Sequence, residues 1–198
     1  PDFLGRASSP AFGLPLPLEP ARVYDGPLAV KFDGYALDKD GRPTFKYRLD
    51  ETFKGPDLAV SETPAPLKGL LATGLGRKFE LTVPGDSQAW FLAGQTAQEP
   101  RLYDATGKPA KLNLKDDEVK AAAVGARVLL PADGGRVFLL EAAGAPAGSA
   151  WRFVPAKGGW LAVLKLPTAR GEQKLGFTLN LWALPKDDEA LIKELMGP

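Results

Sequence analysis

Few residues of the chain combine the types and the spacing that a chemical site needs. Asp38-Lys39-Asp40-Gly41 matches only the first positions of an EF-hand calcium loop; a third acidic or Asn position and the later Glu are missing. Gly74-Leu75-Gly76-Arg77-Lys78-Phe79 begins like a dinucleotide-binding fingerprint, but Phe79 replaces the third Gly and no βαβ pattern surrounds it. We therefore interpret the first segment as a turn and the second as a loop that enters a strand.

The chain of 198 residues contains neither histidine nor cysteine. The commonest general base and the commonest metal ligand are therefore missing, and Ser149 has no G-x-S-x-G frame and no histidine to activate it. Paired carboxylates could still cleave a glycosidic bond, but Asp116-Asp117 and Asp187-Asp188 lie in polar segments where neighbouring side chains diverge. The sequence thus predicts no catalytic residue, no cofactor site, no metal ligand and no enzyme activity.

Charge and hydrophobicity exclude two further classes. Lys and Arg total 25 and Asp and Glu 24, which gives a net charge of +1 and argues against nucleic-acid binding. No apolar run approaches the length of a membrane span, so we expect no transmembrane segment in this chain. Because the sequence begins at Pro1 without an initiator Met, we expect that a leader or a parent segment has been removed.

The elements that must position any site are predominantly strands. Short apolar runs alternate with Gly, Pro and Asp, as is typical of all-β proteins. The predicted strands are 28–37, 43–50, 77–83, 87–93, 127–130, 135–142, 150–154, 160–166 and 174–183, with further candidates at 67–72, 101–103 and 110–114. Strands that are apolar on one face must cover that face, so the sequence predicts an antiparallel two-sheet β-sandwich, with a β-barrel as the alternative.

Turn residues predict which strands form hairpins. Asp40-Gly41 closes 28–37 onto 43–50. Asp133-Gly134-Gly135 lies between 127–130 and 135–142, and Arg170-Gly171-Glu172 links 160–166 to 174–183. We expect an antiparallel hairpin at each of the three turns.

Two segments carry helical signals. Residues 116–123 begin with acidic residues, which favours one or two helical turns. Near the C-terminus an Asp cap, an apolar stripe of Leu191, Ile192 and Leu195, and a Gly follow the rules for a helix start and stop. A helix this short must dock, either on its own sandwich or on a partner. We therefore divide the chain into a Pro-rich strap at 1–27, a β-sandwich at 28–184 and a short C-terminal helix at 185–198.

The strap is too apolar for a free linker. Its prolines disfavour both helix and central strand. The apolar residues that we expect to dock on the chain's own domain or on a partner are Phe3, Leu4, Phe12, Leu14, Leu16 and Leu18. Docking on a partner would make them contact residues, together with Trp182, Leu191, Ile192 and Leu195.

Aromatic and charged side chains suggest two further binding surfaces, with weaker support than the strap and the C-terminal helix. Strand parity places Trp151 and Trp160 in the core. It places Trp182 on the face opposite to Leu175, Phe177, Leu179 and Leu181, either outward or under the C-terminal helix. Exposed tryptophans would indicate a carbohydrate-binding module. The first hairpin would carry mixed charges on one face, which normally indicates a solvated surface and otherwise a charged docking surface: Lys31, Asp33, Lys46, Arg48 and Asp50.

One segment, residues 32–47, resembles a known family. Its pattern is Phe32-x-Gly34-Tyr35-x-Leu37-Asp38-x-x-Gly41-x-Pro43-Thr44-Phe45-x-Tyr47. It resembles an accessory β-rich region of large exported bacterial proteins that combine a c-type cytochrome domain with propeller or quinoprotein-dehydrogenase-like domains. The chain has no C-x-x-C-H haem attachment site and is too short for a propeller, so no haem or catalytic residue carries over. The resemblance implies a periplasmic or extracellular location and an association with redox proteins.

These observations favour a non-catalytic interaction or scaffold subunit of an exported bacterial assembly. Its partner would be a protein, with a c-type cytochrome or a membrane protein complex as the expected class. A carbohydrate-binding module is the alternative and a hydrolase that uses carboxylates alone is the third hypothesis. Three coplanar exposed aromatic rings would favour the carbohydrate-binding module. Two carboxylates that face each other across a pocket would favour the hydrolase.

Overall fold

The computed structural model describes residues 12–13, 29–50, 58–68, 73–85, 88–104, 106–110, 118–120, 126–156, 158–185 and 188–196. The elements in chain order are β2 (Phe12–Gly13), β3 (Ala29–Leu37), β4 (Pro43–Asp50), β5 (Leu58–Lys68), β6 (Thr73–Val83), β7 (Gln88–Thr96), β8 (Arg101–Tyr103), β9 (Pro109–Ala110), β10 (Glu118–Lys120), β11 (Arg127–Pro131), η1 (Asp133–Gly135), β12 (Val137–Ala143), β13 (Ala150–Ala156), β14 (Gly159–Thr168), β15 (Gln173–Leu184) and α2 (Glu189–Met196).

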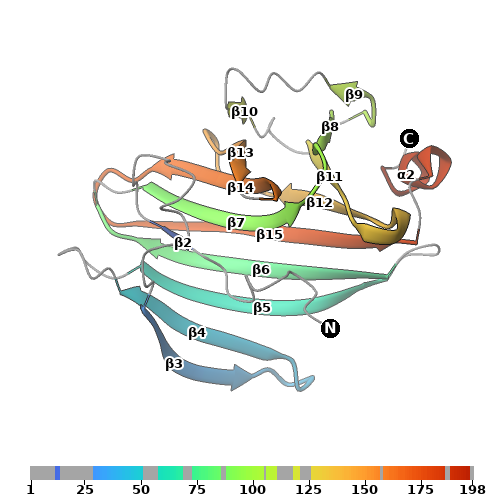
Figure 1. Ribbon diagram of the computed structural model, residues 1–198. Helices are drawn as coiled ribbons and strands as arrows, with labels where there is room; N and C mark the ends of the chain where they lie inside the picture. Colours follow the sequence, from blue (N-terminus) through green and yellow to red (C-terminus); the bar gives the residue numbers. More distant parts are fainter. Residues whose placement is uncertain are drawn as a thin grey trace.

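The strands form two antiparallel sheets of unequal width. The smaller sheet has the order β10-β13-β14-β7-β2, and the larger has the order β3-β4-β5-β6-β15-β12-β11-β8-β9. Neither sheet closes on itself, so the predicted sandwich is confirmed and the barrel alternative is wrong. Figure 1 shows β7, β13 and β14 over the middle of the molecule, whereas β3 and β4 lie at its lower edge.

The core lies between the two sheets and centres on three aromatic rings. Phe79 and Phe177 are directly paired across β6 and β15, with ring centroids 5.1 Å apart. Phe91 of β7 approaches both rings from the opposing sheet, at 4.9 Å from Phe79 and 5.7 Å from Phe177. Trp151 is fully buried in the same cluster and Trp160 packs against it, as strand parity predicts.

The predicted hairpin between 160–166 and 174–183 is wrong. β14 pairs with β13 and β7, and β15 pairs with β12 and β6, so the turn at Gly171 carries the chain from one sheet to the other. Leu164 of β14 and Phe177 of β15 belong to one core cluster, because the apolar faces of the two strands meet across the sandwich. The predicted hairpins at Gly41 and Gly134 are both confirmed.

β5 is the principal strand that the sequence analysis missed, apart from its last residues within 67–72. It contains Pro64 and Pro66, which argue against a central strand. The register explains why they are tolerated: β4 pairs with β5 only from Leu58 to Glu62, so β5 behaves as an edge strand beyond Glu62. Pro64 and Pro66 have no backbone N–H, but β4 does not pair with β5 at these positions, so no hydrogen bond to β4 is lost.

The predicted helix at 116–123 is wrong where the structure describes it. Glu118–Lys120 form β10, an edge strand that pairs with β13 through Val119 and Trp151. Pairing with a neighbouring strand overrides the helical propensity of the segment. The remaining residues of this predicted helix lie outside the described part of the chain.

The C-terminal helix is confirmed as α2. Asp188 caps it, since its Oδ1 accepts hydrogen bonds from the backbone N–H groups of Ala190 (3.0 Å) and Leu191 (3.3 Å). The helix packs on the outer face of the larger sheet in a second apolar cluster. That cluster contains Tyr103, Leu129, Val137, Leu139, Trp182, Leu184, Leu191, Ile192 and Leu195. No helix within the described ranges has the length and apolar character needed to cross a bilayer.

Removing the cap should loosen α2 selectively. We expect Asp188→Ala to weaken the helix by about 1 kcal/mol, because two backbone N–H groups lose their acceptor. Hydrogen–deuterium exchange should accelerate at 190–196 and stay unchanged in β6 and β15. The exposed Lys193→Ala is the control, and equal acceleration in both variants would contradict the capping role.

Candidate functional site

The first hairpin contains a β-bulge that gives its two faces different characters. Phe32 pairs with Tyr47 and Gly34 with Lys46, so Asp33 is an extra residue in β3. Gly34 adopts a φ of 116°, a conformation that residues with a side chain rarely adopt. The bulge turns Asp33 to the polar face and keeps Phe32 and Tyr35 together on the other.

The turn of the hairpin is built by Asp38. Its Oδ1 accepts hydrogen bonds from the N–H groups of Asp40 and Arg42, both at 2.8 Å, and its carbonyl accepts one from Gly41 at 3.0 Å. Backbone donors thus hold Oδ1 of Asp38, so this segment forms a turn, as predicted. The described residues contain no cluster of acidic side chains that could hold a metal ion.

The same turn occurs a second time in the chain. Asp104 Oδ1 accepts from the N–H groups of Thr106 (2.8 Å) and Lys108 (3.0 Å), and its carbonyl accepts from Gly107 (3.0 Å). Both copies follow the pattern D-x-x-G-[RK]-P, and they close the two hairpins at opposite edges of the larger sheet. The sequence analysis missed this repeat although the pattern is readable.

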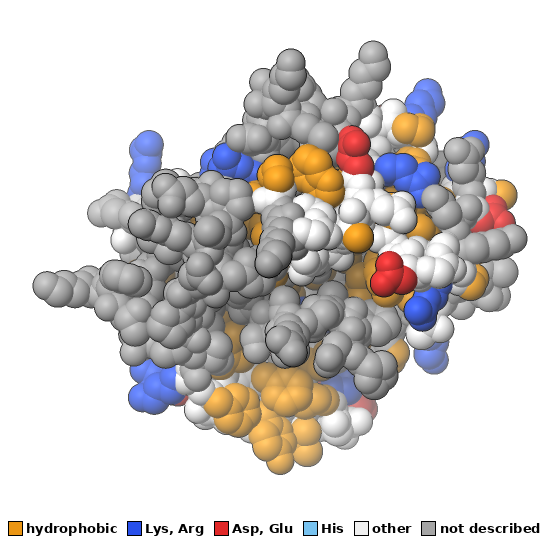
Figure 2. All heavy atoms as spheres, viewed as in Figure 1, with side chains coloured by type: hydrophobic (Ala, Val, Ile, Leu, Met, Phe, Trp, Pro, Cys, Tyr) orange, Lys and Arg blue, Asp and Glu red, His pale blue; other side chains and the backbone are white. Residues whose placement is uncertain are grey.

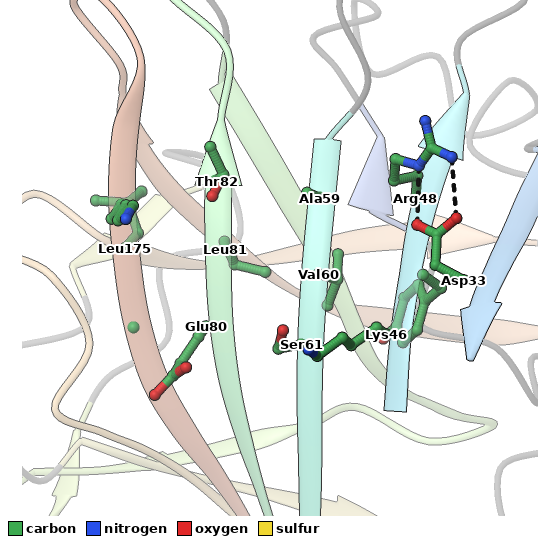
Figure 3. A pocket seen from close by; sticks show the side chains of 13 residues that line it. Asp33, Lys46, Arg48, Ala59, Val60, Ser61, Glu80, Leu81, Thr82 and Leu175 are labelled. Atoms are coloured by element: carbon green, nitrogen blue, oxygen red, sulfur yellow. Dashed lines mark hydrogen bonds and ion pairs between the residues drawn. The ribbon is translucent and has the colours of Figure 1, made fainter. Parts of the chain in front are cut away.

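The polar face of the hairpin forms one wall of a shallow pocket. Arg48 donates to both oxygens of Asp33, from Nε at 2.8 Å and from a terminal nitrogen at 2.9 Å. The pocket has a volume of about 540 Å³ and crosses the outer face of β4, β5, β6 and β15. Figure 3 shows the Asp33–Arg48 pair at one side and the Lys46 side chain lying across β5 toward Ser61.

The two carboxylates of this pocket are poorly suited to glycoside hydrolysis. The hydrogen bond from Arg48 lowers the pKa of Asp33, and the hydrogen bond from Lys78 lowers the pKa of Glu80. A general acid in a glycosidase needs a raised pKa, so both shifts have the wrong direction. The pocket matches a solvated polar surface better than a catalytic cleft.

A second hollow of about 530 Å³ opens at one end of the sandwich. Its walls include Leu130, Leu140 and Leu181, and its rim carries Asp133 and Arg136. The buried hydroxyl of Thr96 donates to the Pro131 carbonyl at 2.6 Å and is therefore not available to a ligand. The opposite signs at the rim give no preference for a charged ligand.

The other side of the hairpin carries an apolar surface that faces solvent. We call Phe32, Tyr35, Leu37 and Phe45 the apolar hairpin face; their side chains are 60%, 63%, 61% and 36% exposed. The register places them on the same side of the larger sheet as Tyr47, which is buried in the core. Figure 2 shows hydrophobic side chains gathered at the lower edge, where β3 and β4 lie in Figure 1.

A half-buried ion pair lies where this face meets the core. Arg77 Nε lies 2.6 Å from Glu62 Oε1, and the Tyr47 hydroxyl donates to Glu62 Oε2 at 3.0 Å. The Arg77 guanidinium also lies 5.0 Å from the ring centroid of Phe79 and 5.8 Å from that of Phe91. Burial of the ring, together with the adjacent Glu62 carboxylate, raises the pKa of Tyr47 far above its ordinary range.

The exposed aromatic rings do not form a flat platform. The Tyr35 and Phe45 rings are tilted by 49°, with centroids 6.5 Å apart, whereas a sugar ring stacks on coplanar aromatics. The tryptophans lie on different surfaces: Trp151 is buried, Trp182 packs against the α2 cluster, and Trp90 lies near Arg152 and Lys165 on the smaller sheet. This arrangement does not favour a carbohydrate-binding surface.

The predicted partner-contact residues fall into three groups. Phe3, Leu4, Leu14, Leu16 and Leu18 lie outside the described residues, and Phe12 lies in β2, paired with Phe91. Trp182, Leu191, Ile192 and Leu195 pack together where α2 docks on its own sheet. The apolar hairpin face was not among these predictions, although the alternation in 43–50 could have indicated it.

No protein-family model matches the sequence, and no curated protein matches it.

The Tyr47 hydroxyl should make the fold sensitive to alkali. An unfolded Tyr loses its proton near pH 10, whereas folded Tyr47 keeps it, so rising pH favours the unfolded state. We expect the free energy of unfolding to fall by about 1.4 kcal/mol per pH unit above pH 10, and Tyr47→Phe to abolish that contribution.

Urea denaturation between pH 8 and pH 11 measures this difference. Tyr35→Phe is the control, because it removes an exposed hydroxyl and leaves Tyr47 in place. Parallel pH profiles for wild type and Tyr47→Phe would contradict the predicted linkage.

The stability of the β-bulge in β3 should depend on Gly34, because its φ of 116° is one that other residues rarely adopt. A Cβ at Gly34 would touch no other atom, so Gly34→Ala should destabilise the protein only through backbone strain, by about 1–3 kcal/mol. Gly176→Ala is the matched control in the same sheet, where a Cβ would lie 3.5 Å from the Phe79 carbonyl oxygen, an ordinary contact. Equal midpoints of urea denaturation for the two variants would contradict the strain argument.

Proposed function

We propose that this protein is a non-catalytic β-sandwich subunit that binds another protein through its first hairpin. The single observation that carries the proposal is the exposure of the apolar hairpin face, which continues the core face of the larger sheet. Covering one such side chain contributes about 1.5–3 kcal/mol, so a partner would gain substantially from this surface. A contiguous exposed apolar surface commonly marks an interaction site.

The expected setting is an exported bacterial assembly with a redox or membrane protein complex. This part of the proposal rests on the resemblance of residues 32–47 to the accessory region of exported cytochrome and quinoprotein-like proteins. The residues of that motif serve as bulge, turn and hairpin face, so they support a binding surface better than a reaction. The protein would hold a redox partner without carrying a cofactor.

Affinity purification of the full chain from native periplasm and membranes tests the proposal. We expect a specific partner to co-purify with wild type and to be lost from Phe32→Ser/Tyr35→Ser. Both side chains are mostly exposed, so the free energy of unfolding should change by less than about 1 kcal/mol.

The matched control substitutes the opposite face of the same hairpin. Lys31→Ser/Lys46→Ser changes two exposed residues and should keep the partner. A monodisperse wild-type monomer that retains no protein would refute the proposal, as would loss of the partner from the control variant alone.

A further inference from the structure

The apolar hairpin face is continuous with the Glu62–Arg77 ion pair. Tyr35 pairs with Phe45, and Phe45 pairs with Glu62 on β5. Arg77 follows on β6, where its Nε reaches Glu62. These residues therefore cross four neighbouring strands, and β3 and β6 lie on the order of 14 Å apart.

The hydrogen bonds of this ion pair leave several donors of Arg77 unused. Each oxygen of Glu62 accepts one hydrogen bond, one from Arg77 Nε and the other from the Tyr47 hydroxyl. Arg77 carries five N–H donors and uses one of them on Glu62, and no acceptor among the described residues contacts its terminal nitrogens.

Those terminal nitrogens are also not sealed inside the protein. Within the described ranges, the buried side-chain nitrogens and oxygens that lack a partner belong to Trp90, Ser149 and Trp151. The Arg77 side chain is 14% exposed, and the Phe79 and Phe91 rings flank its guanidinium. Arg77 thus presents fixed donors at the inner end of an apolar surface.

We infer that the partner segment is an extended apolar polypeptide that carries one carboxylate, and that this carboxylate binds the terminal nitrogens of Arg77. The inference rests on the proposed function and specifies the chemistry of its partner. The planar fork of a guanidinium matches two carboxylate oxygens, and ionised hydrogen bonds are stronger than neutral ones. The flanking apolar side chains would exclude water from the pair.

A second copy of this chain fits the site less well. Its own apolar hairpin face carries no carboxylate, and the neighbouring Glu62 is already held by Arg77 and Tyr47 of the same copy. Two copies that joined face to face would therefore leave the spare donors of both Arg77 side chains without an acceptor. A different segment that brings its own carboxylate satisfies them.

Two fluorescein-labelled pentapeptides test the inference: acetyl-Phe-Leu-Phe-Leu-Glu-amide and its Gln counterpart. With the carboxylate on the last residue, the extended chain runs about 14 Å from the Glu to the first Phe, enough to reach from Arg77 on β6 to Tyr35 on β3. We expect fluorescence anisotropy to show that wild type binds the Glu peptide about tenfold more tightly than the Gln peptide. This comparison uses the unaltered protein.

Variants then locate the carboxylate. Arg77→Gln should abolish the preference for the Glu peptide, and Arg77→Lys should retain part of it because the charge remains without the fork. Lys78→Gln is the matched control, since Lys78 is the next residue of β6 and lies on the outer face. Tyr35→Ser should weaken both peptides equally.

Four results would overturn the inference. Equal affinity for the two peptides, with Tyr35→Ser weakening both, would exclude the carboxylate and leave the proposed function intact. If Tyr35→Ser leaves the affinity for both peptides unchanged, the peptides bind elsewhere. If neither peptide binds to wild type, this surface is not a peptide site. A dimer in sedimentation that Tyr35→Ser dissociates would assign the surface to a second copy.

Discussion

The unequal width of the two sheets is the constraint on which the rest of this structure depends. An apolar sheet face is stable only when another layer covers it, and five strands cannot cover nine. The smaller sheet covers the middle of the larger one, where Phe79, Phe91 and Phe177 meet. Helix α2 covers part of the outer face near Trp182. Most of the large apolar side chains that stay exposed among the described residues lie on the hairpin of β3 and β4.

The bulge of β3 determines what that uncovered hairpin presents. Side chains alternate along a regular strand, so Phe32 and Tyr35, three positions apart, would point to opposite faces if β3 had no bulge. The bulge takes Asp33 out of the register, and the ion pair of Asp33 with Arg48 holds it on the polar face. A single inserted position thus separates an apolar surface from a charged one on the same two strands.

Sequence patterns predicted those parts of the fold that depend on residues close together in the chain. The alternation in 43–50 and 174–183 and the Asp cap of α2 all led to the observed elements. β5 escaped prediction because its tolerance for Pro64 and Pro66 depends on where β4 ends. The connection at Gly171 looks like a hairpin turn, and only the pairing of its flanking strands with other neighbours shows that it crosses between the sheets.

Only part of the candidate site could be predicted from the sequence, because the rest depends on which strands pair with each other. The hairpin and its turn are local, and their residues were identified correctly. The pairing of Glu62 with Arg77 depends on β5, a strand that the sequence did not reveal, so the spare donors of Arg77 could not be anticipated. The partner contacts expected at Leu191 and Ile192 follow a true apolar stripe, which the protein uses to hold its own helix.

The pairing of β6 with β15 also orders events during synthesis. The meander from β3 to β6 contains only neighbouring strands, so it can form as soon as it leaves the ribosome. Phe177 reaches Phe79 only after roughly a hundred further residues have been added, and until then the edge of β6 has no partner. An open strand edge beside exposed aromatic rings is prone to aggregation. The future core therefore stays open on the β15 side of β6 until the last strand has been made.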